Sequence, residues 1–161
     1  VSQLKDVQVI FRQSPKTDGT KHFGSRLVVT PNGNLFVTLG DRFTHMNQAQ
    51  LLNNHIGKLI RIRKDGSVPS DNPFNKHPVA KPEIWSYGHR HIQGAAIHPG
   101  TGALWIHEHG PRGGDEINIP IQNKISIANI INPKIKKLFS STGSVAGVGV
   151  GEGEGNDPPF G

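Results

Sequence analysis

The sequence of 161 residues has the length of one domain, and its 34% of hydrophobic residues, 20 glycines and 12 prolines argue against a helical bundle. No run approaches the roughly 20 consecutive apolar residues of a membrane-spanning helix, and the lack of cysteine excludes disulfides and thiol nucleophiles. The formal charge of +6 favours anionic ligands, but the basic residues are scattered along the chain, so no nucleic-acid partner is predicted.

Alternating apolar and polar residues predict β-strands through most of the chain, beginning with residues 7–11. A hairpin is predicted next, because residues 27–30 and 35–39 flank a Pro-Asn-Gly-Asn turn. Residues 57–63 alternate over their whole length and end at the turn dipeptide Asp65-Gly66. We interpret the lysine and arginines of this segment as protection of an edge strand against pairing with another sheet.

A second hairpin is predicted where residues 95–97 and 103–106 flank a Pro-Gly-Thr-Gly turn. Residues 116–120 have the pattern of one more short strand. The helix candidate before residue 120 lies near residues 47–54 and is short. The predicted fold class is therefore all-β.

A weak internal repeat indicates a β-propeller. Leu35-Phe36-Val37-Thr38 resembles Leu104-Trp105-Ile106-His107, and each copy follows a turn and leads into a glycine-containing loop. Repeated four-stranded sheets are typical of propeller blades, of which a closed ring needs roughly four to eight. Residues 1–122 are therefore predicted to form a partial β-propeller of about two to three blades. Residues 123–161, rich in Gly and Ser, are predicted to form a divergent, disordered tail.

Two residues near predicted strand ends suit catalysis or ligand binding. A histidine side chain can act as a general base toward a hydroxyl, which makes His22 a candidate; the alternative is a surface histidine in a loop. Arg90 offers a fixed fork of donors to a carboxylate or a quinone oxygen. Its alternative is a structural ion pair with Glu83 or Asp115.

The segment that follows the second hairpin contains candidate metal ligands. His107 and His109 would share one face of a strand, which makes a transition-metal site conceivable, but the spacing supplies no third ligand. The loop 110–114 with Asp115 and Glu116 suits Ca²⁺ better, because Ca²⁺ takes carboxylate and backbone carbonyl oxygens. The alternative is a plain acidic loop.

A series of motifs follows the chain in order: HFGSRL at 22–27, GD at 40–41, GKLIR at 57–61, DGSVP at 65–69, DNPF at 71–74, EIWSYGHR at 83–90 and EHGPRGGDEIN at 108–118. Together they resemble the soluble aldose sugar dehydrogenases of the glucose/sorbosone dehydrogenase family. The resemblance covers about residues 5–120 and stops near Ile121.

This resemblance implies a six-bladed propeller that holds pyrroloquinoline quinone (PQQ) and Ca²⁺. His22 matches the general base, which takes the proton of the sugar's anomeric hydroxyl while hydride passes to the quinone. Arg90 matches the arginine beside the reactive quinone carbonyl, where it would stabilise negative charge. Arg90, His91 and His109 are the expected cofactor contacts, and His91 stands where the family has Asn, which changes one of them.

The resemblance also implies metal ligands. The backbone carbonyls of Gly110 and Pro111 match positions that hold the catalytic Ca²⁺, and Glu116 matches a ligand of a second, structural Ca²⁺. Asp115 matches an acid that lines the active site, so we group it with the catalytic residues. At the spacing where the family has a tyrosine that helps to hold the structural Ca²⁺, this chain has Ser126.

The predicted function is thus an oxidoreductase that oxidises the anomeric CH–OH of aldose sugars with hydride transfer to PQQ. The alternative is a catalytically inactive, truncated propeller remnant that acts at most as a binding or interaction module. A propeller hydrolase with a divalent cation would need an inward cluster of Asp, Asn and Glu, which the sequence does not supply. The expected partners are an aldose and an electron acceptor, with self-association through open sheet edges, and relatives imply a periplasmic or secreted location.

Overall fold

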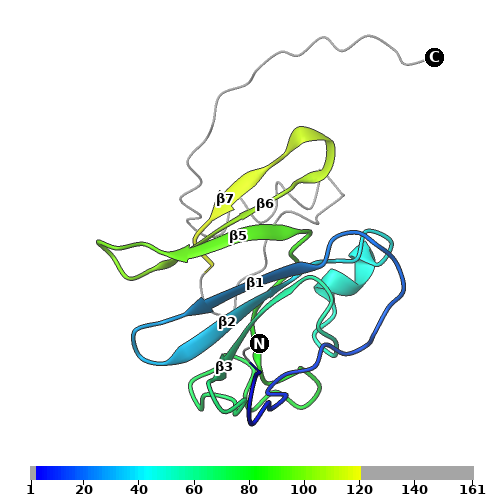
Figure 1. The fold of residues 1–161 in the computed structure, drawn as a ribbon. Helices are drawn as coiled ribbons and strands as arrows, with labels where there is room; N and C mark the ends of the chain where they lie inside the picture. The colour runs from blue at the N-terminus through cyan, green and yellow to red at the C-terminus, as the bar shows by residue number, and fades with distance from the viewer. Residues whose placement is uncertain (1–2, 121–161) are drawn as a thin grey trace, which may run out of the picture.

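The computed structural model describes residues 3–120, so the predicted tail and Ser126 lie outside the described residues. Within that range the chain forms seven β-strands and two short 3-10 helices (Figure 1). In chain order these are β1 (Gly24–Val29), β2 (Asn34–Leu39), η1 (Met46–Gln50), β3 (Lys58–Arg63), β4 (Ile84–Tyr87), β5 (Ile92–Ile97), β6 (Leu104–Glu108), η2 (Pro111–Gly113) and β7 (Glu116–Asn118). The all-β prediction is confirmed, and neither 3-10 helix in residues 3–120 is long and apolar enough to cross a membrane.

The strands form two antiparallel sheets, one in the order β1-β2-β3-β4 and one in the order β5-β6-β7. Both predicted hairpins are present, because β1 pairs with β2 and β5 with β6. The first turn is closed by a hydrogen bond of 2.9 Å from the Gly33 N–H to the Thr30 carbonyl, and Gly33 has the positive φ of +82° that favours glycine. β4 was not predicted, since four residues are too few for an alternating pattern to stand out.

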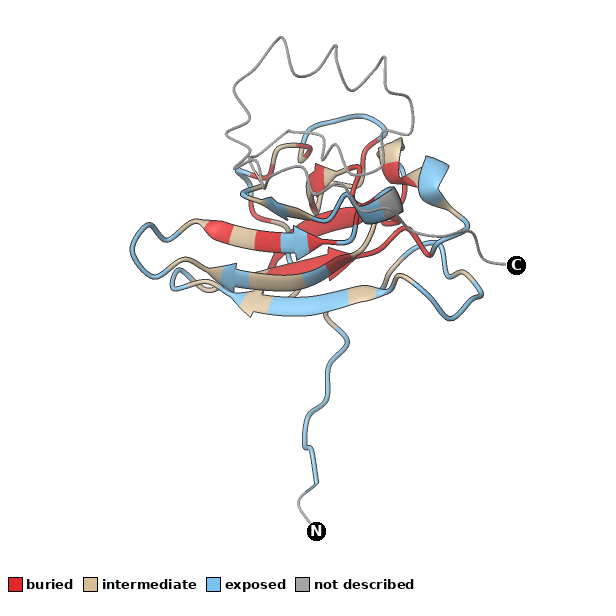
Figure 2. Cartoon of the chain, turned by 90° about the horizontal axis from the view of Figure 1, so that it is seen from above, coloured by how far each residue is buried: buried red, intermediate tan, exposed pale blue. Residues whose placement is uncertain are grey.

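The two sheets share a hydrophobic core. The first strands of the sheets, β1 and β5, contact each other and run side by side (Figure 1). Alternate residues of the strands point between the sheets and form one buried cluster: Phe36, Leu59, Ile92, Leu104 and Ile106, with Val28, Trp85, Ala95 and Ile97 packed against it. Figure 2 shows that buried residues gather in the strands, while the first described residues are exposed. This shared core fixes the position of each hairpin relative to the other.

The predicted strand at residues 7–11 is wrong. The segment forms no strand, and Val7 and Val9 are exposed, while the half-buried Phe11 packs on a second apolar cluster that includes Val37 and Ile60. A strand gains its stability from pairing with a neighbouring strand, and no described strand pairs with this segment. Alternating apolar and polar residues were therefore not sufficient to predict a strand at residues 7–11.

The interpretation of residues 58–63 as an edge strand is also wrong, because β3 lies between β2 and β4. Lys58 is fully buried, and its Nζ donates hydrogen bonds to the carbonyls of Gln48, Ala49 and Ile56 at 3.2, 2.9 and 2.6 Å. Burial lowers the pKa of Lys58 from 10.5 to about 7. Lys58 and Arg61 are therefore buried within the sheet instead of protecting an edge, whereas Arg63 at the end of β3 is exposed.

The predicted helix near residues 47–54 shortens to the 3-10 helix η1. Two of the carbonyls that accept from Lys58, those of Gln48 and Ala49, lie in η1. The ammonium group thus satisfies carbonyls that a longer helix would have bonded internally.

Candidate functional site

Four chain segments, three of which carry predicted site residues, meet at one end of the two hairpins. His22 precedes β1 and Asp41 follows β2, while His91 precedes β5 and His109 follows β6. In an antiparallel hairpin the start of the first strand and the end of the second lie at the same end. Because β1 and β5 run side by side, the two hairpins bring all four segments together.

Backbone hydrogen bonds connect these segments. The Asp41 N–H donates to the Arg90 carbonyl at 2.8 Å, which links the end of β2 to the start of the second sheet. The His109 N–H donates to the His91 carbonyl at 3.3 Å, which links both ends of the second hairpin. The site is therefore attached to both sheets through main-chain groups.

The His22 imidazole is held by a buried carboxylate. Its Nδ1 lies 2.7 Å from Oδ1 of Asp41, whose side chain is 1% exposed, and the Phe43 N–H donates to the same oxygen at 2.8 Å. The His22 ring stacks on His91 at 4.7 Å between centroids. A Cβ at Gly40 would lie 2.0 Å from the His22 carbonyl oxygen, so only glycine permits this approach.

The hydrogen bond to Asp41 assigns the proton of the neutral His22 ring to Nδ1. No group in residues 3–120 hydrogen-bonds to the other nitrogen, Nε2, and the side chain remains 12% exposed. Nε2 is therefore an accessible lone pair on an oriented ring, which is what a general base requires. His22 does lie in the loop before β1, but its side chain is mostly buried and Asp41 orients its ring.

Several non-glycine residues around His22 have left-handed backbone conformations. The φ angles are +53° at His22, +77° at Ser25, +59° at Arg42 and +65° at Phe43. Each such residue costs roughly 1–2 kcal/mol, and such conformations cluster at functional sites. These left-handed residues are thus concentrated at the same end of the hairpins as the candidate site residues.

Arg90 pairs with neither of the carboxylates suggested by the alternative interpretation. Its guanidinium donates from Nη1 to the carbonyls of His109 and Gly110, at 3.1 and 3.2 Å. Glu83 instead accepts from His55 at 2.7 Å, and Asp115 lies 2.9 Å from Nδ1 of His109. The Arg90 charge is thus oriented by carbonyls and remains able to bind an anion.

His91 lies between the two other histidines of the site, with its ring 4.7 Å from His22 and 6.1 Å from His109 between centroids. Its Nε2 lies 3.0 Å from Nε2 of Gln93, a donor, so the neutral ring carries its proton on Nδ1. That Nδ1 is buried without a partner among the described residues. Burial first, then the positive fields of His22 and His109, lowers the pKa of His91.

The predicted Ca²⁺ ligands are engaged within the chain. The Gly110 carbonyl accepts from Arg90, and the Pro111 carbonyl accepts from the Gly114 N–H at 3.3 Å. Glu116 Oε2 lies 3.2 Å from Nδ2 of Asn118. A carbonyl oxygen has two lone pairs, so one hydrogen bond leaves each of these carbonyls able to bind Ca²⁺, and the predicted Ca²⁺ ligands stay a prediction.

The structure does not support His107 and His109 as a transition-metal site. No group of three His, Cys, Asp or Glu residues in the described part of the chain is arranged to hold a metal ion. His109 is hydrogen-bonded to Asp115 through its ring Nδ1, and this hydrogen bond lowers the pKa of the Asp115 carboxyl. The His107 ring covers Gly94, where an added Cβ would lie 1.9 Å from Nε2.

Sequence reasoning missed Asp41 and Glu108 as site residues. In the internal repeat, the Gly-Asp-Arg loop after β2 aligns with the Gly-Pro-Arg loop after β6. The acidic residue in the first of these loops could have indicated Asp41 as a site residue. Glu108 continues the inward-facing series of Leu104 and Ile106 on β6, so the alternation places a carboxylate in the core. The charge of a buried carboxylate needs hydrogen-bond donors around it, so its position in the sequence predicts a polar network in the core.

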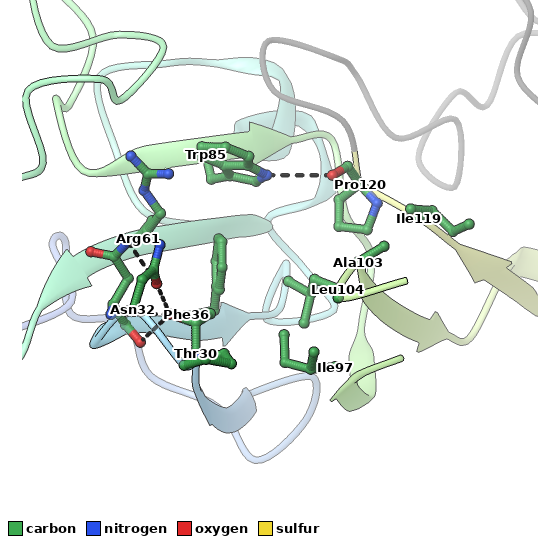
Figure 3. Close-up of a pocket in the computed structure, with 13 residues that line it drawn as sticks. Thr30, Asn32, Phe36, Arg61, Trp85, Ile97, Ala103, Leu104, Ile119 and Pro120 are labelled. Atoms are coloured by element: carbon green, nitrogen blue, oxygen red, sulfur yellow. Dashed lines mark hydrogen bonds between the residues drawn. The ribbon is translucent and has the colours of Figure 1, made fainter. Parts of the chain in front are cut away.

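A groove of about 470 Å³ lies at the opposite end of the hairpins, between the two sheets (Figure 3). Its walls include Phe36, Arg61 and Trp85 from one sheet and Leu104 from the other, and Trp85 Nε1 donates to the Pro120 carbonyl at 3.4 Å. None of the predicted site residues lines it. The groove and the histidine-rich end are therefore separate features.

The chain matches a known family over most of its length. The family model described as Glucose / Sorbosone dehydrogenase matches residues 1–124. The aldose sugar dehydrogenase YliI of Escherichia coli is 49% identical over 124 residues, which are 77% of this chain and 33% of that protein. The quinoprotein glucose dehydrogenase B of Acinetobacter calcoaceticus is 34% identical over 119 residues, which are 63% of this chain and 24% of that protein.

Solved structures agree with the fold. The apo form of the soluble aldose sugar dehydrogenase from Escherichia coli matches with a TM-score of 0.73 at 48% identity, over 76% of this chain and 35% of that chain. The PQQ-bound aldose sugar dehydrogenase from Streptomyces coelicolor matches with a TM-score of 0.59 at 29% identity, over 66% and 30%. This chain spans about a third of the length of these relatives. The prediction of an all-β, partial β-propeller is confirmed, and the chain belongs to the glucose/sorbosone dehydrogenase family.

Proposed function

We propose that this chain carries part of the active site of a PQQ-dependent aldose sugar dehydrogenase, which oxidises the anomeric CH–OH of an aldose with hydride transfer to PQQ. The observation that carries the proposal is the His22–Asp41 pair, with Nε2 of His22 accessible and the ring stacked on His91, the residue that follows Arg90. The named activities of the relatives support it.

The proposed role of His22 is to accept the proton of the anomeric hydroxyl at Nε2. Asp41 would keep the ring oriented and stabilise the imidazolium that forms, since its oxygen lies 2.7 Å from Nδ1. When bound, PQQ supplies the two-electron acceptor. Arg90, which carbonyl oxygens orient, would stabilise the negative charge that develops beside it.

The chemistry of the donors fits an anionic, planar cofactor such as PQQ. Arg90, His91 and His109 are the residues that would hold it. Arg90 can bind an anion, and the buried Nδ1 of His91 is a donor that no described residue satisfies. Asp115, exposed beside His109, is proposed to line the substrate side. The carbonyls of Gly110 and Pro111 are the proposed Ca²⁺ ligands and Glu116 a proposed ligand of a second Ca²⁺, because each of these oxygens has a lone pair beyond its hydrogen bond.

The remaining expectations follow from the same proposal. The substrate partner would be an aldose and the product electrons would pass to an acceptor, in the periplasm or outside the cell. Self-association is proposed through sheet edges that carry exposed apolar side chains, such as Leu27 and Val29 on β1 and Ile117 on β7. A mass above 17.5 kDa in light scattering would support it, and a monomer at every concentration would contradict it.

The direct test adds PQQ to the full chain, with and without CaCl₂, and follows quinone absorbance and the reduction of a dye by glucose. We expect PQQ to bind and glucose to reduce the dye only when PQQ is present. A folded chain, shown by circular dichroism, that binds no PQQ would overturn the proposal. That outcome would favour the inactive propeller remnant.

A further inference from the structure

A buried chain of polar side chains connects the two sheets behind Arg90. Ser86 on β4 lies 2.7 Å from Nε2 of His89, and Nδ1 of His89 lies 3.0 Å from Oε1 of Glu108 at the end of β6. The three residues are 2%, 1% and 1% exposed. The carboxylate therefore accepts from Nδ1–H, and the Ser86 hydroxyl donates to Nε2.

These residue types also occur in acyl-transfer triads, but here the burial excludes that chemistry. A nucleophile must reach its substrate, and the Ser86 hydroxyl is enclosed between the sheets. We therefore look for the role of this series of hydrogen bonds in the other contacts of Glu108, its last residue.

The second oxygen of Glu108 holds the main chain of the site. Oε2 accepts from the Arg90 N–H at 2.9 Å, while Oε1 also accepts from Nδ2 of Asn118 at 3.2 Å. The Arg90 guanidinium in turn binds the carbonyls of His109 and Gly110, the residues that directly follow Glu108. Residues 108–110, at the end of β6, thus hydrogen-bond to both the backbone and the side chain of Arg90 and fix the position of each.

We propose that Glu108 is a positioning residue for Arg90, and that through Arg90 it sets the affinity of the site for its anionic cofactor. The cofactor part rests on the proposed function, whereas the hydrogen bond to the Arg90 backbone does not. Glu108 touches no ligand itself, because it is buried beneath the segment that it fixes.

The first test is amide hydrogen exchange of the full chain without cofactor. Glu108→Met removes both acceptors at similar volume, so the Arg90 amide should exchange at least about tenfold faster than in the wild type. Glu108→Gln keeps the acceptor for the Arg90 N–H, and His89 can shift its proton to Nε2 and accept from the new amide, so protection of the Arg90 amide should return in part, because Nδ2 of Asn118 loses its acceptor at this position. Glu83→Met is the matched control, since it removes the carboxylate that pairs with the buried His55, and the Arg90 amide should be unaffected.

The second test is a double-mutant cycle on PQQ affinity. Glu108→Met should raise the Kd for PQQ about tenfold in the wild type, but less than about twofold when Arg90 is already Ala. Equal effects in both backgrounds would overturn the claim that Glu108 acts through Arg90. A merely destabilising substitution, as in the Glu83→Met control, should leave the Kd unchanged.

The outcomes separate the two proposals. If the wild type binds no PQQ, the proposed function fails, while the exchange of the Arg90 amide still decides the role of Glu108. If Glu108→Met does not fold, the wild-type exchange decides: an amide bonded to a buried carboxylate should exchange only through global unfolding. Fast exchange of the Arg90 amide in the wild type would overturn the inference.

Discussion

Of the three histidine–carboxylate pairs in contact with Arg90 or its neighbours, His22–Asp41 and His89–Glu108 differ in what the second ring nitrogen does. In the first, His22 donates from Nδ1 to Asp41 and leaves Nε2 without a partner in residues 3–120. In the second, His89 donates from Nδ1 to Glu108 while Nε2 binds the Ser86 hydroxyl. The first ring reaches solvent, and the second is enclosed between the sheets.

The difference teaches that the pair alone does not define a catalytic histidine. The His55–Glu83 pair also uses both ring nitrogens, because the Ser14 N–H donates to Nδ1 at 2.8 Å. In both buried pairs the imidazole cross-links parts of the fold. Only where a lone pair remains accessible can the ring accept a substrate proton.

The largest expected effect comes from removing the accessible ring. His22→Ala should lower kcat for sugar oxidation about a thousandfold, because it removes the base, while the Kd for PQQ changes little. The measurement is dye reduction by glucose in the PQQ-loaded protein, beside a PQQ titration. His98→Ala, at the turn between β5 and β6, is the control and should retain turnover. Equal turnover of His22→Ala and the wild type would contradict the assignment of His22 as base.

A smaller effect is expected from the carboxylate that orients this ring. Asp41→Asn keeps the shape but can hold the wrong tautomer of His22, so kcat should fall about 10- to 100-fold with KM nearly unchanged. Glu83→Gln makes the same change in a pair that reaches no substrate, and kcat should stay at the wild-type value. If both variants lose activity equally, the distinction between accessible and buried pairs does not hold.

The sequence carried enough information for the strands and the positions of the main candidates. Turn residues and alternation located both hairpins, and the family motifs singled out His22 and Arg90. The partners of these residues were not predictable in the same way. Asp41 meets His22 only because β2 returns to the start of β1, and Glu108 meets Arg90 only because β6 returns to the start of β5.

Basic residues in strands were the hardest to predict. Exposed edge lysines and buried ones give the same alternating pattern, and only the presence of β4 on the far side of β3 decides between them. β4 itself is too short to be recognised by pattern. The burial of Lys58 therefore depends on a tertiary contact that no local signal announces.

Lys58 offers the smallest test, which extends the comparison from histidines to a buried lysine that serves only the fold. Its pKa is about 7 in the folded chain and 10.5 as the ordinary value, so between these pH values the unfolded state binds more protons. The free energy of unfolding should therefore gain a contribution of about 1 kcal/mol per pH unit as pH rises from 7 toward 10, and this contribution is lost as pH falls again.

Lys58→Met lacks this titration but shares all other groups, so the stability difference between wild type and variant should grow with pH in urea unfolding at pH 7, 8 and 9. Parallel profiles would show that Lys58 keeps an ordinary pKa in the folded chain. The pH dependence of kcat, in contrast, should be the same in both proteins, because a lysine that bonds only to the carbonyls of Gln48, Ala49 and Ile56 has no contact with the accessible pair.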